Sequence, residues 1–301
     1  MNIVEKIPLP VCGLILALLS LGNLLQDVNP YFKGVFGVIG IVFLVLVVLK
    51  VVFYPGCVKR DFENPIIVSS CGTFSMSVMI ISTYIMPFTS DIAYIIWIIG
   101  IVLHILLIIY FTYHFIIRDF NITAVYPSYW IVFVGITMAA ITSKNHNITE
   151  IGNMFFLIGF TSMLITTPLI IYRYIKYPEI PDMNKPLICI FTALYSILIV
   201  GYLNSAQTIS AEFSLGMYIL SCIFYIFSLY KFISYRKLEF YPSFAAFTFP
   251  FVISTTATKE IITHIPINIP LNILLNTQLI IATLLVCYVL VRYLKFLKKT
   301  V

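Results

Sequence analysis

The sequence predicts an all-α integral membrane protein with a single domain, residues 1–301, in which ten transmembrane helices form five quasi-repeated hairpins. Three observations lead to this fold class: the composition, the series of apolar segments and a repeat of prolines. Hydrophobic residues make up 61% of the chain and charged residues only 10%, whereas soluble domains carry about 25% charged residues. The deficit indicates a polytopic protein whose partner is the lipid bilayer, and no nucleic-acid partner is expected.

The apolar segments follow one another along the whole chain, separated by short polar turns. Some are short for a crossing of about 20 residues unless they extend into the turns. The ten expected helices lie roughly at residues 8–26, 34–53, 65–87, 92–117, 127–143, 148–175, 186–203, 212–235, 241–263 and 270–296.

The basic residues predict the orientation. Fifteen of the 18 Lys and Arg residues flank one set of helix ends, and only Lys33, Lys144 and Lys259 flank the other. Because basic residues favour the cytoplasmic side, we expect a multi-pass protein of the cell membrane (plasma or inner membrane) with both termini in the cytoplasm. Membrane insertion explains this excess more simply than attraction of anions does.

Each odd-numbered helix is expected to begin at a proline, which suits the first turn of a helix. The prolines recur at steps of 55 to 62 residues and indicate five hairpins that enter the membrane the same way round. They are Pro8 or Pro10, Pro65, Pro127, Pro186 and Pro242. Acidic residues precede most of them, and we interpret these carboxylates as helix caps or partners of the helix dipole rather than as proton relays. These residues are Glu5, Glu63, Asp182 and Glu239.

The odd helices are rich in small and hydroxyl side chains, whereas the even helices consist mostly of large aliphatic and aromatic ones. Small and polar residues belong where helices meet each other or a cavity, and bulky aliphatic residues belong against lipid. We therefore expect the odd helices to form an inner pore ring and the even helices an outer ring. The pore-lining candidates are Gly13, Ala17, Gly72, Ser75, Gly135, Ala139, Ala193, Ser196, Ala245, Ala246, Pro250 and Thr256.

The ninth helix, within the stretch EFYPSFAAFTFPFVISTTATKE (239–260), departs from its siblings at one position. Seven or eight residues after the opening proline, the third, fifth and seventh helices have Gly72, Gly135 and Ala193, and the ninth has Phe249. A phenyl ring there would narrow a path through the inner ring. A phenylalanine that merely packs between helices would explain the same position.

Pro250 follows Phe249 directly. Proline cannot donate a backbone hydrogen bond and crowds the carbonyl four residues earlier, so we expect the helix to bend here. Towards the outer end of the same helix, Lys259 and Glu260 are candidates for lining a vestibule, and a surface ion pair between them is the simpler alternative.

Four stretches resemble the tellurite-resistance and C4-dicarboxylate transporter family, which includes the plant guard-cell slow anion channels. They are PLPVCGLILALLSLGN, ENPIIVSSCGTFSMSVMIISTY, YPSYWIVFVGITMAA and FYPSFAAFTFPFVIS. The resemblance implies a homotrimer whose protomers each contain a pore ringed by five helical hairpins. It also implies a gate at the phenylalanine of an aromatic-Ser/Thr-Phe pattern in the ninth helix. In this sequence the pattern is Phe247-Thr248-Phe249, so the implied gate is Phe249.

The expected function is that of an anion channel: passive, selective permeation of small inorganic or carboxylate anions. No Asp, Glu or His lies near the centre of an odd helix, and such a residue would be expected in a proton-coupled carrier. The alternative is a secondary carrier that exports or exchanges C4-dicarboxylate, sulfite or tellurite, with or without proton coupling, and so confers tellurite resistance. The sequence contains none of the common hydrolase or nucleotide-binding motifs, so we expect no catalytic residues, no metal site and no cofactor. His104 and His114, on the fourth helix, are interpreted as packing residues.

Overall fold

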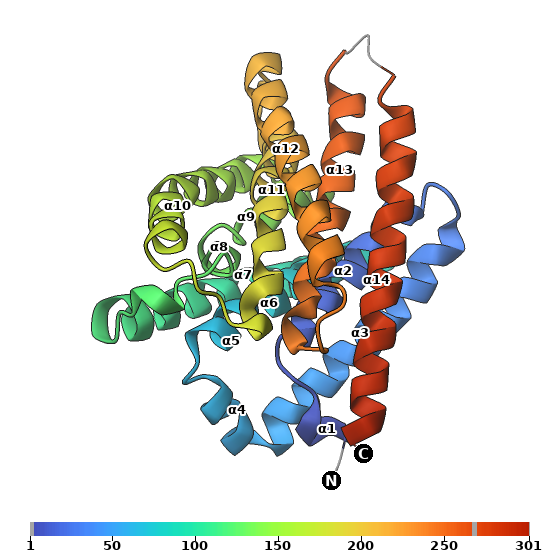
Figure 1. Ribbon diagram of the computed structural model, residues 1–301. Helices are drawn as coiled ribbons and strands as arrows, with labels where there is room; N and C mark the ends of the chain where they lie inside the picture. Colours follow the sequence, from blue (N-terminus) through green and yellow to red (C-terminus); the bar gives the residue numbers. More distant parts are fainter. Residues whose placement is uncertain (1–2, 267–269, 301) are drawn as a thin grey trace.

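The computed structural model describes residues 3–266 and 270–300, and all regular secondary structure in this part of the chain is helical (Figure 1). Five long helices alternate with shorter ones. The long helices are α3 (Pro30–Phe53), α7 (Ser90–Phe111), α10 (Thr149–Lys176), α12 (Ala211–Tyr235) and α14 (Asn272–Thr300). The shorter α-helices are α1 (Ile3–Lys6), α2 (Val11–Leu25), α4 (Pro55–Asp61), α5 (Pro65–Ser70), α6 (Gly72–Ile85), α8 (Tyr129–Phe133), α9 (Thr137–Ser143), α11 (Ile190–Ser205) and α13 (Phe249–His264). A π-helix, η1 (Thr112–Arg118), continues α7, and the 3₁₀ helices are η2 (Ile122–Ala124), η3 (Lys144–His146), η4 (Asp182–Cys189) and η5 (Pro242–Phe247).

Seven described stretches are long and apolar enough to cross a membrane, so the fold is that of a multi-pass helical membrane protein. The predicted crossings at 8–26, 127–143 and 241–263 do not qualify by length, because the structure divides or shortens them. The total of ten crossings therefore stays a prediction.

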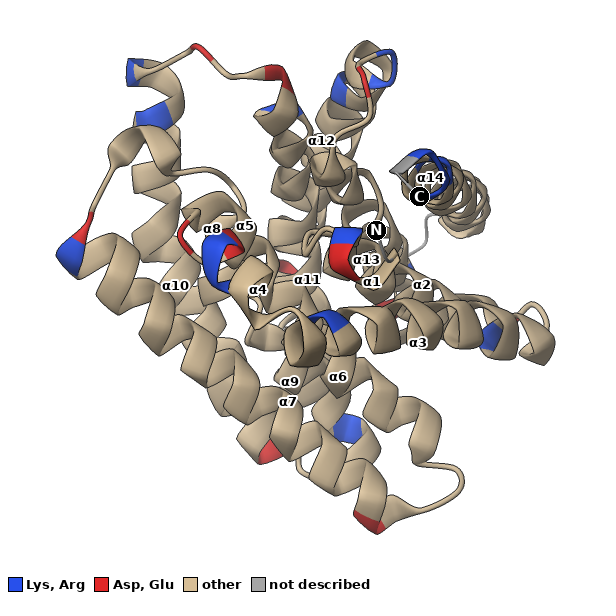
Figure 2. Ribbon diagram, turned by 90° about the horizontal axis from the view of Figure 1, so that it is seen from below, with Lys and Arg blue, Asp and Glu red and all other residues tan. Residues whose placement is uncertain are grey.

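The shorter helices lie at the centre of the molecule. Contacts join α2 to α6, α6 to α9, α9 to α11, α11 to α13 and α13 back to α2, which closes a ring. Each of these helices also packs against the long helix that follows it in sequence. Figure 2 shows α3, α7, α10, α12 and α14 around this ring.

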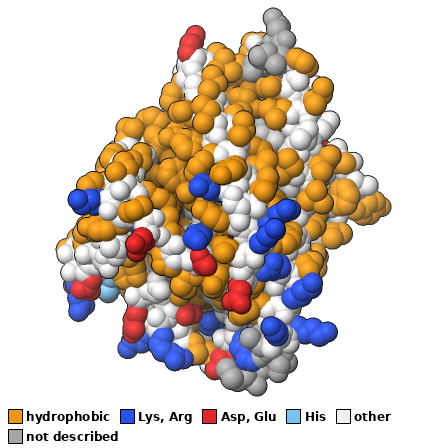
Figure 3. All heavy atoms as spheres, in the orientation of Figure 1, with side chains coloured by type: hydrophobic (Ala, Val, Ile, Leu, Met, Phe, Trp, Pro, Cys, Tyr) orange, Lys and Arg blue, Asp and Glu red, His pale blue; other side chains and the backbone are white. Residues whose placement is uncertain are grey.

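Burial follows the same division. In the most apolar window of each long helix, 28 to 33% of the residues are buried, against 67% for Pro65–Ile85 and 83% for Asp182–Ser205. The outward faces of the long helices carry many exposed large hydrophobic side chains, as expected of a surface that meets lipid. Charged side chains instead concentrate over the end of the molecule where both termini lie (Figure 3).

Four of the five central segments are interrupted or change helix type along their length. The chain passes from α5 to α6 at Cys71, from α8 to α9 at 134–136, from η4 to α11 at Cys189 and from η5 to α13 at Thr248. In the last case the predicted bend before Pro250 is a complete break, with φ −113° and ψ −83° at Thr248. The Thr248 hydroxyl donates a hydrogen bond to the Ala245 carbonyl at 2.6 Å and so satisfies an acceptor near the break.

The interpretation of the carboxylates as caps is wrong for the third, seventh and ninth segments. The prediction that each of these segments begins at its proline is also wrong for the seventh, because Pro186 lies inside η4 (Asp182–Cys189). The side chain of Asn64, rather than Glu63, accepts the hydrogen bond from the first turn of α5, at 2.9 Å from Ile66 N. Neither η4 nor η5 has a side-chain cap, although Asp182 lies in the first turn of η4.

Small residues allow the central segments to approach closely. A Cβ atom added at Gly13 would lie 3.1 Å from Ala245 Cβ, and one added at Gly72 would lie 3.0 Å from the carbonyl oxygen of Ile131. A Cβ at Gly135 would overlap the same carbonyl oxygen and would lie 2.9 Å from His104 Cε1.

Replacement of Gly135 by alanine should therefore destabilise the fold, because the backbone at the α8–α9 break must shift; overpacking of this kind costs about 1–3 kcal/mol. Gly34→Ala is the matched control, since a Cβ at Gly34 meets no atom within 4 Å. Thermal unfolding in detergent should show a lower midpoint for Gly135→Ala and an equal or higher midpoint for Gly34→Ala. Equal midpoints for both variants would contradict the close packing at this break.

Candidate functional site

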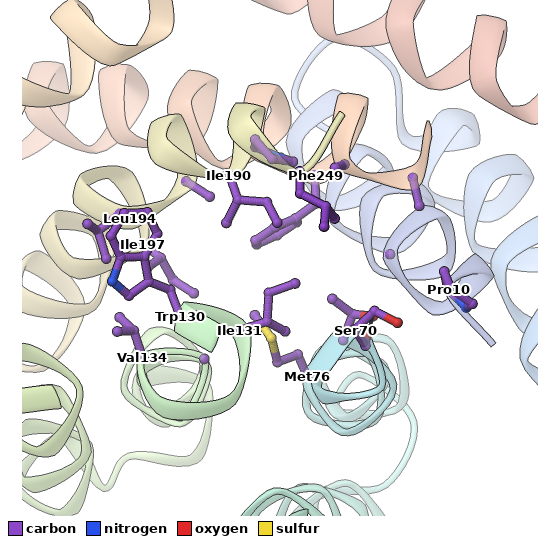
Figure 4. A pocket seen from close by; sticks show the side chains of 18 of the residues that line it. Pro10, Ser70, Met76, Trp130, Ile131, Val134, Ile190, Leu194, Ile197 and Phe249 are labelled. Carbon is purple, nitrogen blue, oxygen red and sulfur yellow. Dashed lines mark hydrogen bonds between the residues drawn. The ribbon is translucent and has the colours of Figure 1, made fainter. Parts of the chain in front are cut away.

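A small cavity of about 70 Å³ lies at the centre of the ring. Its lining residues come only from the five central segments and the short stretches that lead into them. In Figure 4, Phe249 and Ile190 lie across this cavity from Ile131 and Met76. The wall is mostly apolar, and its large side chains are Met76, Trp130, Ile131, Val134, Leu187, Ile190, Leu194, Ile197 and Phe249.

A larger and more polar cavity of about 340 Å³ lies beyond the central cavity, on the side away from the chain termini. We call it the distal vestibule. Its walls include the ends of α2, α6, α9 and α11 and the second half of α13, and its polar residues are Ser20, Asn23, Gln26, Lys33, Thr83, Thr142, Asn145, Asn204, Thr256, Lys259 and Glu260.

A third cavity of about 370 Å³ lies on the side of the termini, and we call it the proximal vestibule. It shares Pro10, Ser70, Leu187 and Ser243 with the central cavity, so the two are contiguous. Its charged and amide residues are Lys6, Lys50, Asp61, Asn64 and Asn184.

The order of the three cavities follows the order of residues along each central segment. On α13, for example, Phe249 and Pro250 line the central cavity, and Ile253 and Thr256 line the distal vestibule. The three cavities thus follow one another along the ring: the central cavity is apolar, the distal vestibule is the most polar, and the proximal vestibule combines charged side chains with a largely apolar wall.

Phe249 differs from its two aromatic neighbours on the same segment. Phe247 is fully buried and its ring packs against Phe232 and Phe244, with centroid distances of 5.2 and 5.1 Å. Phe251, also fully buried, packs against Tyr225 at 5.3 Å. Phe249 is 6% exposed and borders the central cavity, and no aromatic ring of the described chain is in contact with it.

The predicted pore-lining residues fall into three groups. Gly13, Gly135, Ala193, Ala245, Ala246 and Pro250 line the central cavity, and Thr256 lines the distal vestibule. The remaining candidates lie in contacts between or within helices. Ser196 hydrogen-bonds Ser221 of α12 at 2.7 Å, Ser75 hydrogen-bonds His104 at 2.7 Å, Gly72 packs against Ile131, and Ala17 and Ala139 are fully buried.

Lys259 and Glu260 both line the distal vestibule, but they do not pair with each other. The Lys259 ammonium forms an ion pair with Asp27, and Glu260 lies 3.3 Å from His264 Nδ1. The alternative of a surface ion pair between Lys259 and Glu260 is therefore wrong. His146 lies in η3, directly after α9. Burial lowers the pKa of its imidazole, so His146 is mostly uncharged at neutral pH.

Two lysines of the vestibules have roles that sequence reasoning missed. Lys50 is 5% exposed, and its ammonium donates to the carbonyl of Ile7 at 2.8 Å and pairs with Asp61 at 3.1 Å. Lys33 lines the distal vestibule and donates to Gln26 Oε1 at 3.1 Å. In the sequence, both lysines indicate only the orientation of the chain in the membrane. Their positions in the walls of cavities are visible only in the folded structure.

His104 joins α7 to two central segments. Its Nε2 lies 3.0 Å from the carbonyl of Val132, which can only accept, so Nε2 donates and Nδ1 is left for the Ser75 hydroxyl. This buried, fully paired histidine has the packing role expected from the sequence.

The structure also contains an apolar cavity of about 680 Å³ outside the ring, between α3, α6 and α7. Its walls are mainly Val, Leu and Phe side chains, and it shares no lining residue with the three cavities of the path except Leu9, which also borders the proximal vestibule. Its greater volume does not make it the conduit, because it is bounded by the lipid-facing helices.

Comparison with protein families supports the resemblance noted in the sequence. The family model described as voltage-dependent anion channel (SLAC1) matches residues 7–294, almost the whole chain. No curated protein matches the chain. The matched span includes every central segment and every residue that lines the three cavities except Lys6, and the chain belongs to this family of anion channels and transporters.

Proposed function

We propose that this protein is a passive anion channel whose pore runs through the proximal vestibule, the central cavity and the distal vestibule. The observation that carries the proposal is the succession of cavities inside a closed ring of helices: two cavities of about 370 and 340 Å³ with charged residues in their walls lie on either side of an uncharged, apolar cavity of about 70 Å³. In this proposal the chain is one domain, 1–301, that crosses the membrane ten times, with the interrupted segments inside and the long helices outside.

Phe249 is the proposed gate. An anion in an apolar constriction loses hydration that the wall cannot replace, so a narrow apolar segment blocks the current. The phenyl ring of Phe249 faces the cavity, whereas those of Phe247 and Phe251 are held by other rings. The break at Thr248, directly before Phe249, gives the ring a backbone that is not locked into a continuous helix.

Passive flux is favoured over proton coupling by the position of the titratable groups. The residues lining the central cavity are all uncharged, and the charged ones of the path lie in the two vestibules. A proton-coupled carrier needs a titratable side chain that can bind a proton and that lies within reach of the substrate site. His104, the nearest buried candidate, is fully occupied by Ser75 and Val132.

Replacement of Phe249 by alanine should raise the anion conductance of the protein in planar bilayers at least tenfold, because the blocking ring is removed. Expression and oligomeric state should remain those of the wild type. Phe247→Ala is the control: it removes a fully buried ring and should cost about 3–5 kcal/mol of stability without a gain in current. If the two variants conduct equally, Phe249 is not the gate.

Coupling can be measured in proteoliposomes. With a chloride gradient, the reversal potential should follow the chloride gradient and stay unchanged when a pH gradient is added, because the constriction holds no proton-binding group. Stoichiometric proton uptake that accompanies malate would overturn the channel proposal and support the carrier.

The proposed assembly is a homotrimer in the plasma or inner membrane with both termini in the cytoplasm. The family resemblance supports the trimer, and the charges gathered at the end with the termini support the orientation. The protein mass in native detergent complexes, corrected for bound detergent, should be three times the 34.3 kDa of one chain. A stable monomer or dimer would contradict the trimer.

A further inference from the structure

Among the residues that the structure describes, the distal vestibule contains a lysine that forms no ion pair, and the one carboxylate among its lining residues, Glu260, lies instead against His264. Lys33 is half-buried; its ammonium donates to the Gln26 side chain at 3.1 Å and lies 5.0 Å from the ring centroid of Tyr84. In the described part of the chain, Lys33 forms no salt bridge. The other cation of this vestibule, Lys259, is paired with Asp27, and Lys50 of the proximal vestibule is paired with Asp61.

Polar atoms near Lys33 also lack partners. Ser20 is 9% exposed, and its hydroxyl has no hydrogen-bond partner. The amide nitrogen of Asn23 donates to Thr83 Oγ1 at 2.9 Å, but its buried Oδ1 accepts no bond. All of these side chains line the distal vestibule.

These polar groups belong to neighbouring parts of the chain, the second half of α2 and the start of α3. Ser20, Asn23 and Gln26 are spaced by three residues, and α2 carries the first two on one face. The backbone of Lys33 lies against the same helix, since a Cβ added at Gly22 would lie 3.3 Å from the Lys33 carbonyl oxygen. The Lys33 ammonium and the free Ser20 hydroxyl thus line the same cavity of about 340 Å³ without contacting each other.

We propose that Lys33 and Ser20 form a binding site for a small anion in the distal vestibule, one step before the constriction at Phe249. An ammonium and a hydroxyl both donate to an anion, and Asn23 Oδ1 can accept from a water that remains on the ion. This inference rests on the proposed function, because the site would hold an anion in the distal vestibule before the anion enters the central cavity of the channel.

The open surroundings suit a transient site. A positive charge that is unpaired but half-exposed raises the local anion concentration without holding the ion in the way that a buried cation would. Lys259 cannot take the place of Lys33, because the carboxylate of Asp27 already neutralises the Lys259 ammonium.

The test measures chloride currents and chloride binding of the full-length protein. In the conducting Phe249→Ala background, Lys33→Gln should lower the single-channel conductance about threefold or more at low ionic strength, and the loss should disappear near 1 M salt, where charges are screened. Lys33→Arg should restore the conductance. Lys144→Gln is the matched control, since it removes the same charge from an exposed position at the same end of the molecule and should leave the conductance within about 1.5-fold of the parent.

Chloride binding to the purified protein provides a readout that does not depend on currents. The line broadening of the chloride NMR signal should be reduced by Lys33→Gln and by Ser20→Ala and unchanged by Lys144→Gln. If the Phe249→Ala protein conducts but Lys33→Gln and Lys144→Gln behave alike in both assays, the site at Lys33 is wrong and the channel proposal stands. If it carries no current, the channel proposal fails, and the NMR comparison alone decides whether the site exists.

Discussion

The arrangement of this protein depends on one constraint: backbone polar groups that lack helical partners cannot face lipid. A continuous helix satisfies its own hydrogen bonds and can stand at the periphery, as α3, α7, α10, α12 and α14 do. The interrupted segments cannot. At the break before Phe249, the Ala245 carbonyl accepts hydrogen bonds from both the backbone N–H and the hydroxyl of Thr248, and the surrounding long helices shield the central segments from lipid.

The same constraint accounts for where a path can run. The central segments combine helix breaks with small side chains. The segments therefore pack closely at Gly13 and Gly72 but leave a cavity beside Phe249. Hydroxyl and amide groups gather in the vestibules, where water can reach them, and the middle stays apolar. In the proposed channel, an anion would therefore be solvated best in the two vestibules and would meet the main barrier at the apolar central cavity.

Much of this organisation could be predicted from sequence, because hydropathy reports directly on lipid contact and prolines lie at or near most starts of the central segments; Pro186, inside η4, is the exception. The inner position of the small-residue segments and the place of Phe249 on the cavity wall are visible in the residue pattern. The breaks could not be located from it, since a proline such as Pro250 is compatible with either a bend or an interruption. Charge partners were also beyond reach: Lys50 and Asp61 are close in sequence, but Lys259 and Asp27 meet only through the closure of the ring. For the same reason the unpaired state of Lys33 could not be inferred before the fold was known.

The closure of five central segments into a ring within one chain has a consequence for how such a protein can change over evolutionary time. In a ring built from identical subunits, one substitution appears at every equivalent position, and five phenyl rings at one level would obstruct each other. Here a single gene copy encodes each sector separately, so Gly72, Gly135, Ala193 and Phe249 can differ at corresponding places. The centre of the ring can thus be altered one segment at a time by single mutations, and in the proposed channel such mutations would change permeation in small steps.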